Sequence, residues 1–139
     1  MLTEEHKAAY LRIIEAVSAG DFDALDALFA ADMVDHNPIP DQMRGLAGFK
    51  QWMATARRSF PDLHGTVEHV VAEGELVAGH VTWHGTQAGP FVGLAPSGQL
   101  VAFEAYHIAR FEGGKVAEWW GTADIFGALA QLGALLGPG

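Results

Sequence analysis

The glycine pair Gly113-Gly114 is the feature that most restricts how this chain can fold. It separates two runs rich in valine, alanine and aromatic residues, 99–112 and 115–124. Consecutive glycines reach the positive φ angles that both central positions of a type I′ turn require, and such a turn joins antiparallel strands directly. The sequence therefore predicts an antiparallel hairpin within a larger sheet.

A second hairpin and several helices precede this one. Runs 63–74 and 75–87 are rich in valine and threonine and meet at a glycine, which predicts two more antiparallel strands. Helical spacing of apolar residues marks three earlier segments, and a short apolar run from Ile125 predicts a last helix; the three segments are 4–20, 21–30 and 45–59. Residues 32–45 contain two prolines and predict a loop.

This order of elements predicts the α+β class, because the helices are segregated from an antiparallel sheet. We expect a single domain over residues 1–139. In it, a curved four-stranded antiparallel sheet, three N-terminal helices and a short C-terminal helix enclose a cone-shaped pocket.

A two-residue turn also predicts which residues of the last hairpin lie opposite each other. Counting outward from the turn, His107 faces Trp120 and Phe103 faces Asp124. Opposed residues share a face of the sheet, so these four residues are expected on the pocket side and Trp119 on the other side. Four residues along a strand span about 13 Å, so His107 and Asp124 are not expected to touch.

Composition narrows the class of partner. The 139 residues carry a formal net charge of −9 and include no cysteine. The excess of acidic over basic residues argues against nucleic acid and anionic membranes as partners, because both bind basic surfaces. The first ten residues carry charges where a signal peptide needs an apolar stretch, and no apolar run approaches ~18 residues, so we expect a cytoplasmic protein. The histidines His69, His80 and His84 share a strand face without metal-ligand spacing, and we expect no metal site.

Five motifs in order carry a resemblance to a known family: ADMVDHNP, SFPDLHGTVEHVVAEGELVAGHVTWHGT, GPFVGLAPSG, HIARFEGGKVAEWWGTAD and QLG. Over residues 28–133 the chain resembles the SnoaL-like polyketide cyclases, within the nuclear-transport-factor-like fold group. The resemblance implies a cone with a deep apolar pocket, in a homodimer or higher homo-oligomer. It also implies intramolecular aldol condensation of a hydrophobic small molecule without a cofactor.

The resemblance assigns roles to several residues. Asp124 matches the acid/base aspartate late in the last strand, and His107 matches a histidine before the last hairpin. His36 and Asn37 fall at the pocket mouth. Gln87 stands where family members often have histidine, so only a hydrogen-bonding role remains there. The expected pocket lining also includes Phe49, Trp52, Met53, Phe103, Trp120 and Tyr10.

A structural alternative stays open for each candidate. Aspartate is among the best N-caps, so Asp124 could simply begin the last helix. A histidine such as His107 in a strand is often a core or surface residue, and asparagine before proline, as at Asn37, commonly starts a turn. The aromatic residues of the third helix could be ordinary core.

The leading hypothesis is a cofactor-independent enzyme. Asp124 would remove a proton α to a carbonyl, and His107 or Asn37 would hold the enolate oxygen. A non-catalytic binding protein would need the same pocket without a titrating aspartate. An epoxide hydrolase would need acidic and basic partners beside a water, and a ketosteroid isomerase would need a phenol or protonated acid as oxyanion donor, for which Tyr10 stays open.

Overall fold

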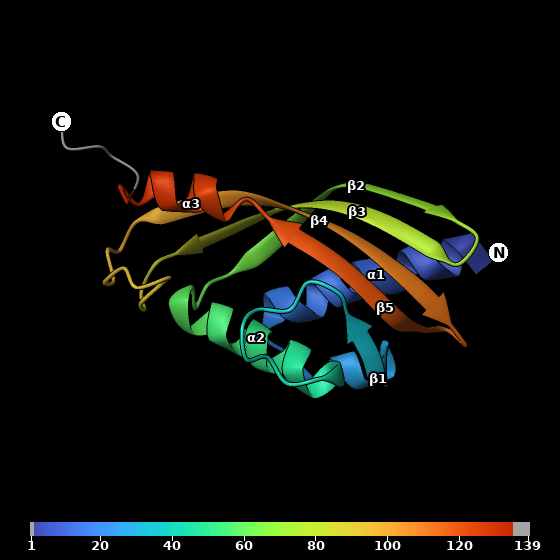
Figure 1. Ribbon diagram of the computed structural model, residues 1–139. Helices are drawn as coiled ribbons and strands as arrows, with labels where there is room; N and C mark the ends of the chain where they lie inside the picture. Colours follow the sequence, from blue (N-terminus) through green and yellow to red (C-terminus); the bar gives the residue numbers. More distant parts are fainter. Residues whose placement is uncertain (1, 135–139) are drawn as a thin grey trace.

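The computed structural model describes residues 2–134 as a curved five-stranded sheet with its two long helices over one face and a short C-terminal helix at the end of the sheet (Figure 1). The strand order is β1-β5-β4-β3-β2, with β1 parallel to β5 and all other neighbours antiparallel. The elements in chain order are α1 (Leu2–Ala19), the 3-10 turn η1 (Asp23–Ala27), β1 (Phe29–Asp35), α2 (Gly45–Ser59), β2 (His64–Glu73), β3 (Leu76–Thr86), β4 (Leu100–Glu112), β5 (Lys115–Ala123) and α3 (Ile125–Gln131).

Both predicted hairpins and three of the four predicted helices were confirmed. Gly113 and Gly114 have φ angles of 60° and 82°, as a type I′ turn requires. The helix predicted over 45–59 is α2, and the C-terminal helix begins at Ile125. The prediction of an α-helix over 21–30 was wrong, because these residues form only the 3-10 turn and the start of β1.

The prediction of four antiparallel strands was wrong, because β1 adds a fifth strand parallel to β5. Its two buried residues, Phe29 and Met33, are four positions apart, a spacing typical of a helix. Residues four apart also share a face of a strand, but Ala31 between them is exposed and the register shifts between Phe29 and Val34. Strict alternation is absent, so the sequence pattern did not indicate a strand here.

A bulge in β5 overturns the predicted register of the last hairpin. Phe111 pairs with Val116, but Arg110 pairs with Glu118, which leaves Ala117 as an extra residue. The bulge sends Glu118 to the outer face of the sheet, where its carboxylate accepts a hydrogen bond from Arg110. Unbroken alternation would have placed this carboxylate beside buried Val116, at a cost of several kcal/mol.

The register shift exchanges the faces predicted for the two tryptophans. His107 lies opposite Gly121, not Trp120, and Trp119 faces inward with an exposed fraction of 5%. Trp120 lies opposite Ile108 on the outer face. The prediction that Trp120 and Asp124 share the face of His107 was therefore wrong.

The core lies between the inner face of the sheet and the helices α1 and α2. The largest fully buried side chains include Tyr10 of α1, Phe29 of β1 and Phe111 of β4. Each such side chain contributes roughly 2–3 kcal/mol by leaving water. Gln131 ties α3 to the start of β4, because its amide donates to the Ala102 carbonyl and accepts from the Ala102 N–H. Within residues 2–134, no helix has the length and apolar character needed to cross a bilayer.

Candidate functional site

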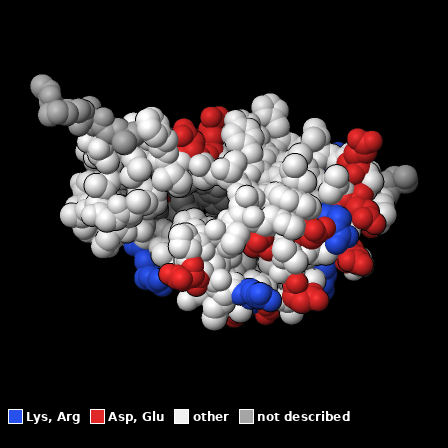
Figure 2. All heavy atoms as spheres, viewed as in Figure 1, with Lys and Arg blue, Asp and Glu red and all other residues white. Residues whose placement is uncertain are grey.

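A cavity of about 370 Å³ opens between the inner face of the sheet and the helices α1 and α2. Figure 2 shows a hollow in the surface, bordered mainly by uncharged atoms. The lining residues are Ile13, Ile14, Val17, Asp35, Asn37, Ile39, Phe49, Trp52, Met53, Ala56, Leu63, Trp83, Phe103, Ala105, His107, Trp119, Gly121, Thr122, Ala123 and Ile125. Most are apolar, so the cavity suits a hydrophobic ligand.

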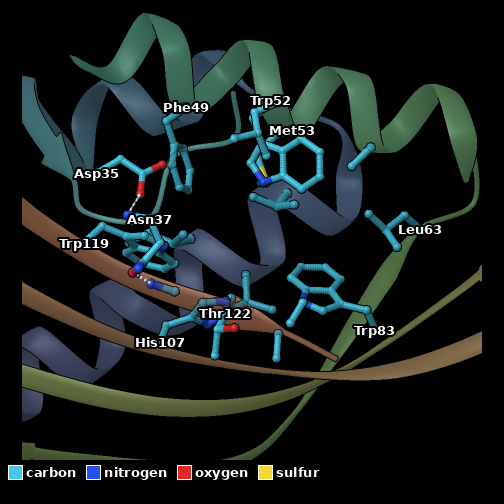
Figure 3. A pocket seen from close by; sticks show the side chains of 18 of the residues that line it. Asp35, Asn37, Phe49, Trp52, Met53, Leu63, Trp83, His107, Trp119 and Thr122 are labelled. Carbon is cyan, nitrogen blue, oxygen red and sulfur yellow. Dashed lines mark hydrogen bonds between the residues drawn. The ribbon is translucent and has the colours of Figure 1, made fainter. Parts of the chain in front are cut away.

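Aromatic side chains from both layers form the walls of the cavity (Figure 3). Phe49, Trp52 and Met53 come from α2, while Trp83 and Trp119 come from β3 and β5. The rings of Phe49 and Trp119 meet edge to face with centroids 5.4 Å apart. Rigid aromatic walls of this kind favour a flat or compactly folded ligand.

Polar groups gather at one end of the cavity. Asp35 and Asn37, at and just after the end of β1, lie above His107 of β4 in Figure 3. The Asn37 N–H donates to Asp35 Oδ1 at 3.0 Å, and the Gly121 N–H donates to Asn37 Oδ1 at 3.0 Å. Gln42 Nε2 donates to Asp35 Oδ2 at 2.9 Å, so both oxygens of this carboxylate accept a bond.

His107 lies on the floor of this polar end, backed by a buried tyrosine. Its Nδ1 is 2.8 Å from the hydroxyl of Tyr10, which is fully buried and lies behind the cavity wall rather than in it. Burial lowers the pKa of His107 to about 4 and raises the pKa of Tyr10 above its ordinary value. Both groups are therefore neutral near pH 7, and His107 can act there as a hydrogen-bond donor or acceptor without carrying charge.

Asp124 caps α3 in this structure. Its Oδ1 accepts a hydrogen bond from the Gly127 N–H at 2.8 Å, and the residue is exposed. Its chain neighbours Ala123 and Ile125 line the cavity, whereas Asp124 itself does not. The structural role that the sequence left open is thus present, at the rim of the cavity.

His36 and Trp120 meet outside the cavity. Their rings stack with centroids 4.5 Å apart and planes 5° apart, and His36 Nε2 is 2.9 Å from Glu118 Oε1. Two hydrogen bonds hold the pKa of Glu118 below its ordinary value: the larger effect comes from Arg110 and the smaller one from His36. The prediction that Trp120 lines the cavity wall was wrong, because the β5 bulge carries it to the outer face. His36 was predicted at the cavity mouth, but it stacks on Trp120 and is not among the lining residues.

The structure brings together most of the predicted lining and adds residues that the sequence reasoning missed. Asn37, Phe49, Trp52, Met53, Phe103 and His107 line the cavity as predicted. Asp35, Trp83 and Trp119 were missed. Asp35 is the one carboxylate among the lining residues that the structure describes, and it lies next to His36 in the motif already singled out.

Gln87 has a structural role away from the cavity. Its side chain is fully buried, donates to the carbonyls of Leu94 and Ala95, and accepts from the Ser97 hydroxyl at 2.6 Å. These bonds hold the loop between β3 and β4 in shape. In the part of the chain that the structure covers, no three histidine, cysteine or acidic side chains converge as they would around a metal ion.

Comparison with known proteins identifies the family of this chain. A sequence model described as SnoaL-like polyketide cyclase matches residues 7–132. The chain belongs to the SnoaL-like polyketide cyclase family. One curated relative, aklanonic acid methyl ester cyclase AcmA of Streptomyces galilaeus, is 26% identical over 132 residues, covering 93% of this chain and 91% of that protein.

Solved structures of family relatives have the same fold. IdmH of Streptomyces antibioticus, a candidate polyketide cyclase, superposes with a TM-score of 0.83 at 29% identity and covers 92% of this chain and 98% of its own. AclR of Streptomyces galilaeus, a candidate hydroxylase, superposes with a TM-score of 0.86 at 29% identity and covers 97% of this chain and 89% of its own. The fold therefore carries more than one proposed chemistry, and the reaction has to be argued from the cavity.

Proposed function

We propose that this chain is a cofactor-independent cyclase that closes a ring in a hydrophobic, polyketide-like substrate by intramolecular aldol condensation. The observation that carries the proposal is the cavity, an apolar and tryptophan-lined space with carboxylate, amide and imidazole groups at one end. Such a space fits a folded substrate whose carbonyl groups face the polar end. Family membership supports the same class of reaction.

The reaction needs a base, a donor for the enolate oxygen and a folded substrate. The base removes a proton α to a carbonyl, and the electron pair moves to the carbonyl oxygen as an enolate. The α-carbon then forms a carbon–carbon bond to a second carbonyl carbon, whose oxygen becomes an alkoxide and takes up a proton. His107 and Asn37 supply donors at the polar end, and the apolar walls exclude water and hold the two reacting carbons together.

We assign the proton transfer to Asp124 and a bracing role to Asp35. Both Asp35 oxygens already accept hydrogen bonds that tie the carboxylate to its own loop. Asp124 engages only Oδ1, and no described residue donates to its Oδ2. Turning this side chain toward the cavity gives up one cap bond, which costs about 1 kcal/mol and is small beside the barrier of the reaction.

A matched pair of variants tests this assignment. The assay supplies aklanonic acid methyl ester, the compound named for the relative AcmA, without any cofactor. Aldol ring closure conserves mass, so the product is an isomer that chromatography and mass spectrometry can separate. Asp124→Asn keeps the size and the cap acceptor, and should lower kcat about 10²- to 10⁴-fold. Asp35→Asn should lower it much less.

The same assay separates the alternatives. The reverse order of the two variants would move the base to Asp35, and unchanged turnover in both would refute proton transfer by aspartate. A product heavier by one oxygen atom would indicate hydroxylation, as suggested for AclR. Bound but unaltered ester would indicate a binding protein. The expected homodimer or higher homo-oligomer stays a prediction that light scattering can measure.

A further inference from the structure

The hydrogen bond between Tyr10 and His107 restricts where the imidazole proton can be. Within the described residues, His107 Nδ1 is the sole hydrogen-bond partner of the Tyr10 hydroxyl, which is fully buried. A phenol has one hydrogen to donate. If Nδ1 carried the imidazole hydrogen, the phenol hydrogen would be buried without an acceptor. That penalty favours the opposite arrangement by roughly tenfold to a hundredfold.

In the favoured arrangement, Tyr10 donates to a bare Nδ1 and the hydrogen of neutral His107 is on Nε2. No described group forms a hydrogen bond with His107 Nε2, and Nε2 is accessible rather than sealed inside the protein. Since His107 lines the cavity, Nε2 is open to it. Burial disfavours both the imidazolium and the phenolate, which keeps the pair in this neutral state near pH 7.

Two glycines make room for this pair. In the sheet, His107 lies between Gly79 of β3 and Gly121 of β5. A Cβ on Gly79 would lie 2.1 Å from the Tyr10 hydroxyl oxygen, and a Cβ on Gly121 would lie 3.1 Å from His107 Cδ2. The distance at Gly79 is too short for any Cβ while Tyr10 stays in place, so Gly79 leaves the space that the tyrosine ring occupies. The contact at Gly121 is tight rather than prohibitive, and the nearest atom to a Cβ there is Trp119 Nε1 at 2.9 Å.

We propose that Tyr10 is a positioning residue that holds His107 as its Nε2–H tautomer, so that His107 donates a hydrogen bond to a carbonyl or enolate oxygen in the cavity. In this arrangement His107 cannot be the base, because its one bare nitrogen is occupied by Tyr10. A donor aimed at developing negative charge typically contributes 10²- to 10³-fold to kcat. The inference rests on the proposed function only for the identity of the acceptor.

The tautomer can be measured on the free protein without a substrate. Long-range ¹H–¹⁵N correlation spectra of the imidazole distinguish a protonated from a bare ring nitrogen. The expected wild-type result is a protonated Nε2 and a bare Nδ1 from pH 6 to pH 8. Tyr10→Phe should let both tautomers become populated and should lower kcat with little change in KM. The matched control Tyr106→Phe removes the only other tyrosine hydroxyl, on the outer face, and should change neither readout.

A wild-type protein with the hydrogen on Nδ1 would overturn the inference, and this measurement does not depend on whether Tyr10→Phe folds. An unchanged tautomer in folded Tyr10→Phe would also overturn it. Loss of cyclisation activity has a separate meaning: an intact Nε2–H tautomer in a protein that closes no ring counts against the proposed function and leaves the tautomer inference standing.

Discussion

Acidification should destabilise this protein more than a variant with glutamine at position 107. Burial lowers the pKa of His107 from its ordinary 6.5 to about 4. Between these values the unfolded chain binds a proton at this residue and the folded chain does not. Stability rises with pH wherever the unfolded state binds more protons. The His107 contribution is therefore fully present above pH 6.5 and is lost as the pH falls toward 4.

The size of the effect follows from the width of this window. Each pH unit inside it changes the free energy of unfolding by about 1.4 kcal/mol for one proton, so the full window amounts to about 3 kcal/mol. That loss is a large part of the 5–15 kcal/mol typical of a folded domain. For a domain of this size it corresponds to roughly 10 °C in Tm. His107→Gln cannot titrate and should lose less stability over the same range.

Urea unfolding followed by circular dichroism between pH 7.5 and pH 4.5 measures the difference. The wild type should lose about 2.5 kcal/mol more than His107→Gln over this range, which covers about two pH units of the window. His64→Gln is the matched control, because it removes an exposed histidine of β2 and should keep the wild-type pH dependence. Parallel curves for the wild type and His107→Gln would refute the reasoning, since they would mean that His107 binds its proton equally in both states.

The remaining predictions concern the stability of the site and its supports, and urea unfolding checks each of them. Trp119→Ala should cost about 3–5 kcal/mol because its ring is buried, whereas Trp120→Ala should cost about 1 kcal/mol, the value of one stacked aromatic pair; equal costs would contradict the faces assigned here. Deleting Ala117 removes the extra residue and leaves Val116, Glu118 and Trp119 in regular alternation on their present faces, so the shortened chain should change in stability by less than about 1 kcal/mol; a loss of several kcal/mol would contradict the bulge assigned to Ala117. Asp124→Ala should cost about 1 kcal/mol through loss of the cap, and no change would show that the cap does not stabilise α3.

Much of the fold could be predicted because its signals are local. The glycine turn at Gly113-Gly114 and the alternation around it lie within a few residues of each other, so the hairpin was predictable from that stretch alone. The strand β1 has no such signal. It is short and irregular, and its partner Val116 in β5 lies far along the chain. Only the finished sheet offers β1 an edge to pair with.

The wrong faces predicted for Trp119, Trp120 and Asp124 follow from a single inserted residue. Trp119 and Trp120 are adjacent and chemically identical, so no composition argument separates them. Ala117 decides between them, because the bulge at this residue reverses the faces of everything that follows in β5. A turn predicts the strand register only as far as the first bulge. Nothing in the sequence identifies this alanine as the bulged residue. Asp124 was assigned to the inner face by the same count.

The strand that the sequence did not reveal is also the one that assembles the polar end of the cavity. Because β1 runs parallel to β5, the chain leaves it at the level of Trp119, where the His36 N–H donates to the Trp119 carbonyl at 2.9 Å. One residue later, Asn37 accepts from the Gly121 N–H, and Gly121 is the cross-strand neighbour of His107. An amide from the N-terminal third of the chain is thereby fixed beside an imidazole from β4. Without the parallel pairing the cavity would keep its aromatic walls and lose its polar end, so the edge strand supplies chemistry and not only sheet area.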